Sequence, residues 1–425
     1  MKIRFYNARI LTMENDRFKI INGELCTENN LIEYIGSERK CDIKFDREIN
    51  LNNNLIMAGF KNAHSHSPMT FLRSYADDLP LKEWLYNKVF PLEEKLNPEY
   101  IYWFTKLAIM EYLTSGITSC FDMYKNPQAM ADSAIDSGFR MVLCGEINNF
   151  LETPESIEQY YNKFNSYNPL ISYQLGFHAE YTTSEKILRA IAKLSQKYKA
   201  PVFMHNSETL NEVNECIKRY GTTPTTLFES LGMFEYGGGG FHCIYMSEED
   251  LNIFKNKKLW AVTNPASNLK LASGIAPLCI MAEKNINLAI GTDGSASNNC
   301  LDMFREMFLA TVLQKVNLKD ASAFPAEKVL EMAVKGSADA MGLYNSDSLE
   351  KGKNADLTVI DIHSPNMQPE NDIVKNIVYS GSKSNIILTM VNGKILYENG
   401  KFNIGEKPET IYRTVNKFVK EIKAL

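Results

Sequence analysis

Histidine is the residue whose placement carries the most chemical information in this sequence. The chain of 425 residues contains six histidines, and His64 and His66 flank a single serine. Residues i and i+2 of an extended chain point to the same side, so these two imidazoles can face one metal ion. An H-x-H segment alone is a moderate signal, and its meaning depends on which other ligands lie nearby.

Further candidate ligands and proton carriers follow apolar runs later in the chain. Glu208 stands three residues after His205, His242 ends another apolar run, and Asp293 lies in a Gly-Thr-Asp-Gly segment. Nitrogen and oxygen ligands around an open position suit zinc or iron. We predict one divalent ion per subunit, with zinc preferred and iron as the alternative. The predicted ligands are His64, His66, His205 and Asp293.

Together these residue types can hydrolyse a bond at an sp² carbon. A bound metal lowers the pKa of its water toward neutrality and makes hydroxide available. Asp293, as ligand and base, can take the proton from that water, and Glu208 can carry a proton to a ring nitrogen and then to the leaving amine. His242 can orient the attacking water and stabilise the tetrahedral intermediate. Deamination of an amino-heterocycle is the reaction that this set fits best.

Each residue also has a structural interpretation when it is taken singly. His242 can be read as a hydrogen-bonded core histidine, Asp293 as a turn residue, and Glu208 as a solvated glutamate at a helix start. The joint pattern favours chemistry, because chance placement of nearly every histidine at one face is improbable. His363 is the exception, and we interpret it as structural or as a surface residue.

The elements that must bring these residues together are predicted to be repeated βα units. Short apolar runs alternate with amphipathic stretches such as Pro98–Thr114 and Ser184–Tyr198, which is typical of a parallel sheet covered by helices. The predicted strands are Leu55–Phe60, Ile117–Phe121, Phe139–Cys144, Ile171–Phe177, Pro201–His205, Gly239–His242, Leu259–Thr263 and Leu288–Gly291. They suffice to close a (β/α)8 TIM-like barrel of the α/β class, in which the carboxyl ends of the strands meet at the catalytic face. An open doubly wound sheet, the alternative, would need a glycine-rich phosphate turn after the first strand, and the sequence has none there.

Both chain ends are predicted to be β-rich and to meet in one module. Strand patterns at Ile3–Ala8 and Leu357–Ile362, with a hairpin signal at Asn392-Gly393, mark the two ends. We therefore expect a composite β-sandwich domain from residues 1–56 and 352–425, and a metal-dependent hydrolase barrel from residues 57–351. The predicted fourth barrel strand contains no lysine, which favours a mononuclear site over one bridged by a modified lysine.

Composition limits the classes of binding partner and the cellular compartment that we expect for this protein. The net charge is −5 and no block of Lys and Arg is present, which argues against nucleic acid or an anionic membrane as the main partner. The chain shows neither a signal peptide nor an apolar run long enough to span a bilayer. The eight cysteines include no C-x-x-C pair, so reduced thiols in a cytoplasmic protein are the simplest interpretation.

Several motifs resemble those of the amidohydrolase superfamily, in the branch of methylthioadenosine/S-adenosylhomocysteine deaminases and triazine hydrolases. The motifs are MAGFKNAHSHSPMTFLRSYADDLPLKEWL from Met57, HNSET from His205, FHC from Phe241, TNPASNLKLASGIAPL from Thr263, GTDGSASNN from Gly291 and GKNADLTVID from Gly352. By this resemblance, Trp84 and Glu93 line the nucleoside pocket, with the glutamate on the ribose diol, and His178 contacts the purine ring. Trp84 can equally be a core residue, and Glu93 can simply open the helix after Pro91.

Two positions depart from the family's pattern. In homocysteine-recognising members, arginines meet the substrate's carboxylate; the first would fall on Gly145 here, and no Arg or Lys stands between Arg140 and Lys163. A carboxylate needs a paired cation to be held well, so this departure favours a neutral 5′ group, as in adenosine, methylthioadenosine or 5′-deoxyadenosine. Asn206, at a position usually apolar in the family, suggests altered substrate contacts.

The resemblance implies a metal-dependent hydrolytic deaminase of an aminopurine nucleoside, with a small molecule as substrate. One alternative is a deaminase or chlorohydrolase of a free base, pterin or triazine. A second is a non-catalytic assembly protein on the same scaffold, against which the retained metal ligands argue. Relatives are often oligomeric, so a homo-oligomer is an option that no motif in the sequence decides.

Overall fold

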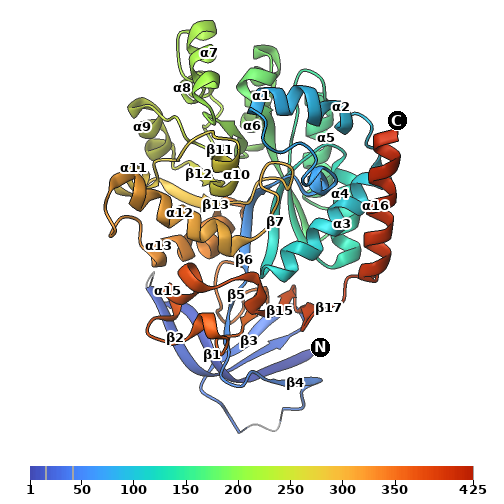
Figure 1. Ribbon diagram of the computed structural model, residues 1–425, viewed down its shortest axis with the longest axis vertical. Coiled ribbons are helices and arrows are strands. Elements are labelled where there is room, and N and C mark those ends of the chain that lie inside the picture. Colours follow the sequence, from blue (N-terminus) through green and yellow to red (C-terminus); the bar gives the residue numbers. More distant parts are fainter. Residues whose placement is uncertain (15–16, 41–42, 425) are drawn as a thin grey trace.

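Two β-sheets organise the chain in the computed structural model, which describes residues 1–14, 17–40 and 43–424. One is a parallel sheet rolled up inside a ring of helices, and the other lies below it and is built from both ends of the chain (Figure 1). The barrel and the separate sheet agree with the architecture expected from the sequence. We propose the division into residues 57–351 and residues 1–56 with 352–425 as the domain boundaries.

The parallel sheet supplies the barrel wall. In the described part of the chain it has eight strands, in the order β13-β12-β11-β10-β9-β8-β7-β6. They are β6 (Phe60–Ser65), β7 (Ile117–Met123), β8 (Arg140–Cys144), β9 (Ile171–Ala179), β10 (Val202–Asn206), β11 (Gly238–His242), β12 (Trp260–Thr263) and β13 (Asn287–Ile290). The first and last strands meet where Asp293 N–H donates to the His64 carbonyl oxygen at 2.9 Å and Thr292 N–H donates to Asn62 Oδ1 at 2.8 Å. The barrel is therefore joined at the place where two predicted ligands lie.

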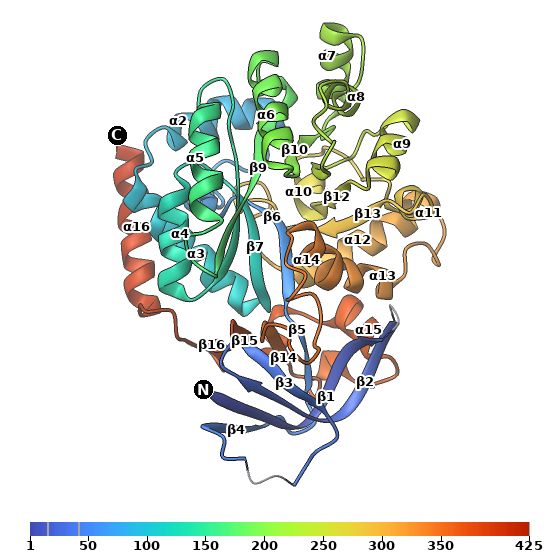
Figure 2. The ribbon, with the colours of Figure 1, turned by 180° about the vertical axis from the view of Figure 1, so that it is seen from behind.

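Helices cover the outside of the barrel between successive strands (Figure 2). Local signals set their starts: Asn97 caps α3 by accepting a hydrogen bond from Tyr100 N–H, and Pro98 occupies the first turn. The helices are α1 (Leu81–Trp84), α2 (Phe90–Glu93), α3 (Pro98–Thr114), α4 (Pro127–Ser137), α5 (Pro154–Phe164), α6 (Glu185–Tyr198), α7 (Leu210–Tyr220), α8 (Pro224–Ser230), α9 (Glu248–Lys257), α10 (Pro265–Lys270), α11 (Leu278–Glu283), α12 (Met303–Leu318), α13 (Ala326–Glu331), α14 (Ser337–Ala340), α15 (Ile373–Lys375) and α16 (Pro408–Ala424).

The second sheet joins the two ends of the chain. Within the described residues it has nine strands, in the order β17-β16-β15-β14-β5-β1-β2-β3, with β4 paired to β1. They are β1 (Lys2–Glu14), β2 (Arg17–Glu28), β3 (Leu31–Gly36), β4 (Arg47–Asn50), β5 (Leu55–Ala58), β14 (Leu357–Ile360), β15 (Ile386–Val391), β16 (Lys394–Glu398) and β17 (Lys401–Phe402). The last helix, α16, leaves this sheet and packs along α3 on the barrel's side (Figure 1).

The first predicted barrel strand, Leu55–Phe60, is wrong in its placement. Most of it is β5, which pairs with β1 and β14 of the end sheet, and the barrel strand β6 begins only at Phe60. The chain crosses between the sheets at Gly59, where a Cβ would lie 2.1 Å from Thr118 Cγ2. Two consecutive buried strands look like one apolar run in the sequence, because only the glycine separates them.

Two further features bear on the expectations from composition. In the described residues, no helix combines the length and the apolar character that crossing a bilayer requires. The cysteines that the structure describes have free thiols, and Cys41 lies outside the described residues.

Candidate metal centre and pocket

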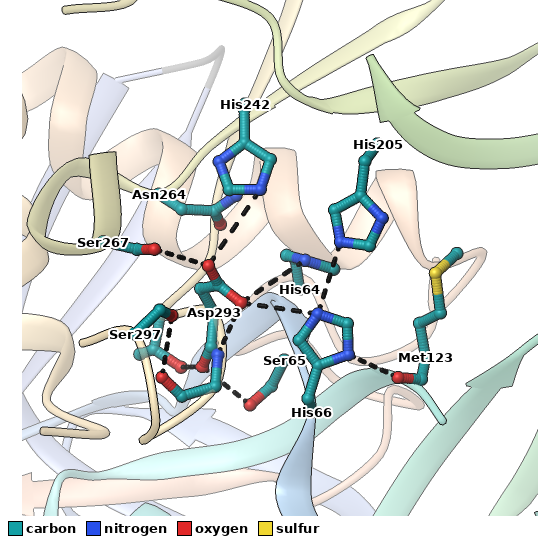
Figure 3. A network of polar contacts seen from close by, with 12 residues as sticks. His64, Ser65, His66, Met123, His205, His242, Asn264, Ser267, Asp293 and Ser297 are labelled. Atoms are coloured by element: carbon teal, nitrogen blue, oxygen red, sulfur yellow. Dashed lines mark hydrogen bonds and ion pairs between the residues drawn. The ribbon is translucent and has the colours of Figure 1, made fainter. Parts of the chain in front are cut away.

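Three barrel strands, β6, β10 and β13, deliver the four predicted ligands to one place at the carboxyl end of the barrel (Figure 3). His66 Nε2 lies 3.4 Å and His64 Nε2 lies 3.8 Å from Asp293 Oδ1, and His205 Nε2 lies 3.3 Å from His66 Nε2. All of these side chains are buried. Two overlapping sets of side chains could hold a metal ion, and within each set the ligand atoms all lie within 4.8 Å of one another. One set is His64, His66 and Asp293, and the other is His64, His205 and His242. The structure thus brings together all four predicted ligands and adds His242 beside them.

Hydrogen bonds from the outer ring nitrogens of His66 and His205 determine which nitrogen of each ring faces the centre of the site. His66 Nδ1 contacts the Met123 carbonyl oxygen at 2.5 Å, and His205 Nδ1 contacts the His178 carbonyl oxygen at 2.7 Å. A carbonyl oxygen accepts only, so each Nδ1 carries the proton and each Nε2 carries a lone pair. Two lone pairs 3.3 Å apart repel each other unless a cation lies beside them. Backbone carbonyls behind ligating histidines are the usual arrangement at metal sites.

His64 completes this donor set. Its ring stacks on Phe241, with centroids 3.8 Å apart and planes 18° from parallel. In the described part of the chain, neither of its ring nitrogens has a hydrogen-bond partner. Burying an imidazole without a hydrogen-bond partner costs folding free energy, and a metal ion bound to its nitrogen would supply the missing partner. The residues present therefore fit a divalent metal ion bound by nitrogen and oxygen.

Asp293 is held by short contacts on both oxygens. Ser267 Oγ donates to Oδ2 at 2.5 Å, and Gly294 N–H donates to Oδ1 at 2.6 Å. Burial alone would raise the pKa of this carboxyl, but His66, His242 and these donors outweigh it and lower the pKa. Asp293 and His242 both have left-handed backbones, with φ of 61° and 71°. Such strain at non-glycine residues is concentrated at functional sites, because the surrounding structure must hold it in place.

Glu208 and His242 form a second charged pair beside the ligands. Glu208 Oε2 lies 3.9 Å from His242 Nε2, and Asp293 Oδ2 lies 4.0 Å from the same nitrogen. Burial raises the pKa of Glu208. Burial alone would lower the pKa of His242, but the two carboxylates outweigh it and raise that pKa. Asn268 Oδ1 fixes the ring by accepting from His242 Nδ1 at 2.7 Å. Both shifts favour the protonated form of the side chain, as proton or hydrogen-bond donation to a reacting group requires.

A pocket opens over this group. It is lined by His66, Met69, Trp84, Leu85, Phe90, Glu93, Glu146, His178, Tyr181, His205, Glu208, His242, Leu271, Asp293 and Ser297. Trp84, Glu93 and His178, the predicted substrate contacts, therefore lie in the pocket wall. Burial, followed by the neighbouring His66, lowers the pKa of His178 to about 3, so its ring is neutral at physiological pH.

Some residues of the site carried no clear signal in the sequence. Ser267 and Asn268 orient Asp293 and His242, and both lie in the TNPASNLK segment, whose resemblance to the family was the available hint. Glu146, in the pocket wall, was missed because nothing distinguishes it from a surface glutamate. Asn206 Nδ2 donates to Thr225 Oγ1 at 2.8 Å, so this amide is engaged by α8 and is not among the pocket residues.

Residues 55–396 match the model of the amidohydrolase family. The chain belongs to this family. The amidohydrolase is 38% identical over 418 residues to a protein of Syntrophomonas wolfei named 5-methylthioadenosine/S-adenosylhomocysteine deaminase, with 97% of each chain covered. It is 36% identical over 419 residues to a protein of the same name from Pyrococcus furiosus, covering 96% of this chain and 97% of the other.

Solved structures show the same architecture. A zinc-bound adenosine deaminase from Xanthomonas campestris superposes with a TM-score of 0.93 and 28% identity, covering 100% of this amidohydrolase and 99% of that chain. An atrazine chlorohydrolase from Arthrobacter aurescens complexed with zinc gives a TM-score of 0.89 at 19% identity, covering 98% of this chain and 100% of the other, which shows the shared fold.

Proposed function

We propose that this amidohydrolase is a metal-dependent hydrolytic deaminase of an aminopurine nucleoside and releases ammonia. The observation that carries the proposal is the set of inward-facing imidazole nitrogens and the Asp293 carboxylate, gathered at the base of one pocket. The relatives named as methylthioadenosine/S-adenosylhomocysteine and adenosine deaminases support the nucleoside as substrate. We place the reaction in the cytoplasm and leave the subunit number open.

The residues assigned to the metal are His64, His66, His205 and Asp293, and zinc is the proposed ion, one per chain. The zinc in the Xanthomonas campestris adenosine deaminase supports this choice. When bound, such an ion supplies Lewis acidity and lowers the pKa of a water molecule toward neutrality. The carbonyl contacts on His66 and His205 place the proton of the neutral rings on Nδ1 and direct both Nε2 atoms inward.

Glu208, His242 and Asp293 are assigned to the proton transfers. Asp293 accepts a proton from the attacking water through its carboxylate. Glu208, whose pKa burial raises, delivers its proton to the ring nitrogen of the substrate, then takes up the proton of the added hydroxyl and passes it to the departing amine. The proton held by Asp293 returns to Glu208 and closes the cycle. His242, held by Asn268 and with its pKa raised by the Glu208 and Asp293 carboxylates, donates a hydrogen bond from Nε2 to the oxygen that adds to the ring carbon. Glu212 supports this geometry by accepting hydrogen bonds from Ser207 N–H at 3.0 Å and Glu208 N–H at 2.8 Å.

The substrate contacts are assigned to three residues of the pocket wall. Trp84 offers an apolar face to the nucleoside, and the neutral His178 ring contacts the purine. Glu93 is directed by Tyr124, whose hydroxyl donates to Oε1 at 2.6 Å. A buried carboxylate of this kind can accept two hydrogen bonds from a ribose diol.

A substrate panel tests the proposal. Ammonia release and the ultraviolet shift are measured with adenosine, methylthioadenosine, S-adenosylhomocysteine, guanine and cytosine, using the zinc-loaded full-length protein. We expect the adenosine-type nucleosides to be deaminated with the highest kcat/KM. Turnover of guanine or cytosine with none of the nucleosides would replace the proposal by a free-base deaminase, and absence of turnover together with absence of bound metal would favour a non-catalytic protein.

A further inference from the structure

Glu146 is a buried carboxyl in the pocket wall to which the mechanism above gives no role. It follows β8 by two residues, and 6% of the side chain is exposed. Its Oε2 atom has no hydrogen-bond partner among the described residues. A buried polar atom without a partner points to a ligand that satisfies it. The Glu146 carboxyl is therefore directed into the pocket that is assigned to the substrate.

The surroundings of Glu146 differ from those of the metal centre. Glu208 and Asp293 interact with histidines. Glu146 instead experiences the charges of other carboxyls, those of Glu93 and Glu152 most strongly and that of Asp122 more weakly. The carboxyl of Glu93 is already hydrogen-bonded to Tyr124. Burial and these neighbouring acids raise the pKa of Glu146 well above its ordinary value. The charged groups that act most strongly on Glu146 are therefore acids and Lys125, and none of them is a proposed metal ligand.

Cations are scarce in this part of the pocket. Among the side chains that the structure describes, none of the lining residues is a lysine or an arginine. Lys125 is the cation that interacts with Glu146, and its Nζ is engaged by the Glu93 carbonyl oxygen. The neighbouring Gly145 leaves no room for a cationic side chain, because a Cβ there would lie 2.7 Å from the Gly176 carbonyl oxygen. A carboxylate placed here would meet acids and no paired cation.

We propose that Glu146 is a specificity-determining residue, which accepts a hydrogen bond or a positive charge from the 5′ end of the nucleoside and excludes substrates that carry a carboxylate there. The inference rests on the proposed function, because it requires a nucleoside whose ring lies at the metal centre. The 5′ carbon is then remote from the reacting carbon and is the ribose position that carries an exchangeable substituent. A positive charge beside Glu146 stabilises its ionised form and pairs with it, whereas a carboxylate there would add to the acids that already raise its pKa.

The test compares three nucleosides that differ in charge at the 5′ carbon. They are 5′-amino-5′-deoxyadenosine, adenosine and adenosine-5′-carboxylate, and kcat/KM is measured by ammonia release at pH 8 and constant ionic strength. For the wild-type protein we expect the amino compound to exceed the carboxylate by at least about 100-fold, because like-charge contacts cost several kcal/mol. In Glu146→Gln this ratio should fall by at least about 10-fold, with adenosine still deaminated. Glu155→Gln changes an exposed glutamate of α5 in the same way and should leave the ratio unchanged.

The outcomes separate this inference from the proposed function. If adenosine is deaminated but Glu146→Gln leaves the charge ratio as in wild type, the inference is overturned and the proposed function stands. Equal kcat/KM for the amino and carboxylate compounds in the wild-type protein overturns the inference without any variant, which covers the case that Glu146→Gln fails to fold. If the metal-loaded wild-type protein deaminates none of the three, the proposed function itself has failed.

Discussion

The Nε2 atoms of His66 and His205 lie 3.3 Å apart, although 139 positions of sequence separate the two residues. Both rings are turned by a backbone carbonyl, that of Met123 for His66 and that of His178 for His205. The rings therefore present lone pairs to each other, and a positive ion relieves their repulsion. His66 follows β6 and His205 lies in β10, so the two rings meet only when the barrel brings the ends of these strands together.

Removing one of these imidazoles should remove the metal. We expect His205→Ala to lose most of its bound zinc, because it deletes one of the proposed ligands, and to unfold at a lower temperature, since the ion binds only the folded site. Metal content is measured by elemental analysis and unfolding by calorimetry. His363→Ala is the matched control, because His363 is an exposed histidine bonded to the Asn52 carbonyl oxygen, and it should keep its metal. Full metal occupancy in His205→Ala would contradict the ligand assignment.

Glu208→Gln should separate metal binding from turnover. The amide keeps the size of the side chain and leaves the proposed ligands intact, so zinc content should match that of wild type. It cannot carry a proton, and kcat should fall by about 10²–10⁴-fold, the usual contribution of a general acid–base group. Glu235→Gln, at an exposed position, serves as control. A Glu208→Gln protein with wild-type kcat would rule out the proton-transfer role.

Glu93→Ala should distinguish a nucleoside from a free base. If the carboxylate accepts hydrogen bonds from the ribose, its loss should lower kcat/KM for adenosine by about 10- to 100-fold, since hydrogen bonds to charged groups contribute about 1.5–3 kcal/mol. Any turnover of a substrate without ribose should change little. Both are measured by ammonia release on the same preparation. Equal losses for both kinds of substrate would indicate a structural role through Tyr124 instead.

Lys61 should make stability depend on alkaline pH. Its Nζ is buried in β6 and donates to the Gly59 carbonyl oxygen at 2.7 Å and to Thr118 Oγ1 at 2.9 Å. Burial lowers the pKa of Lys61 to about 8, from the 10.5 that is usual for a lysine in the unfolded chain. Between these two values the unfolded chain binds more protons than the folded one, so this group stabilises the fold increasingly as pH rises from 8 toward 10.5.

The Lys61→Met variant isolates this effect. It lacks the titrating group, so the free energy of unfolding of wild type relative to Lys61→Met should rise by about 2–3 kcal/mol between pH 7 and pH 10. Denaturant unfolding of the metal-loaded proteins at several pH values measures the difference. Lys417→Met, on the exposed side of α16, should show no such trend. A difference that stays constant with pH would contradict the lowered pKa.

Much of the barrel was predictable because its strands are short apolar runs that end at polar residues. The runs ending at His205 and His242 became β10 and β11 with bounds shifted by one residue. The convergence of the proposed ligands was predictable because strand ends of a barrel meet at one face whatever lies between them. That argument needs the number and order of strands and does not depend on their bounds.

Other features depend on contacts that no local pattern reveals. The crossing at Gly59 joins two apolar strands from different sheets, and the sequence alone does not show which sheet each one joins. The left-handed backbones of His242 and Asp293 are set by their surroundings. Glu146 is buried in the pocket wall, whereas a glutamate in a loop is ordinarily exposed.

The pairing of β5 with both β1 and β14 has a consequence for folding during synthesis on the ribosome. Barrel strands β6 to β13 leave the exit tunnel before β14, which starts at Leu357, has been translated. Domains tend to fold as their residues emerge, so β5 waits beside β1 with one edge open while the barrel assembles. An unpaired strand edge invites aggregation, and the nascent chain carries this exposed edge until β14 emerges and pairs with β5.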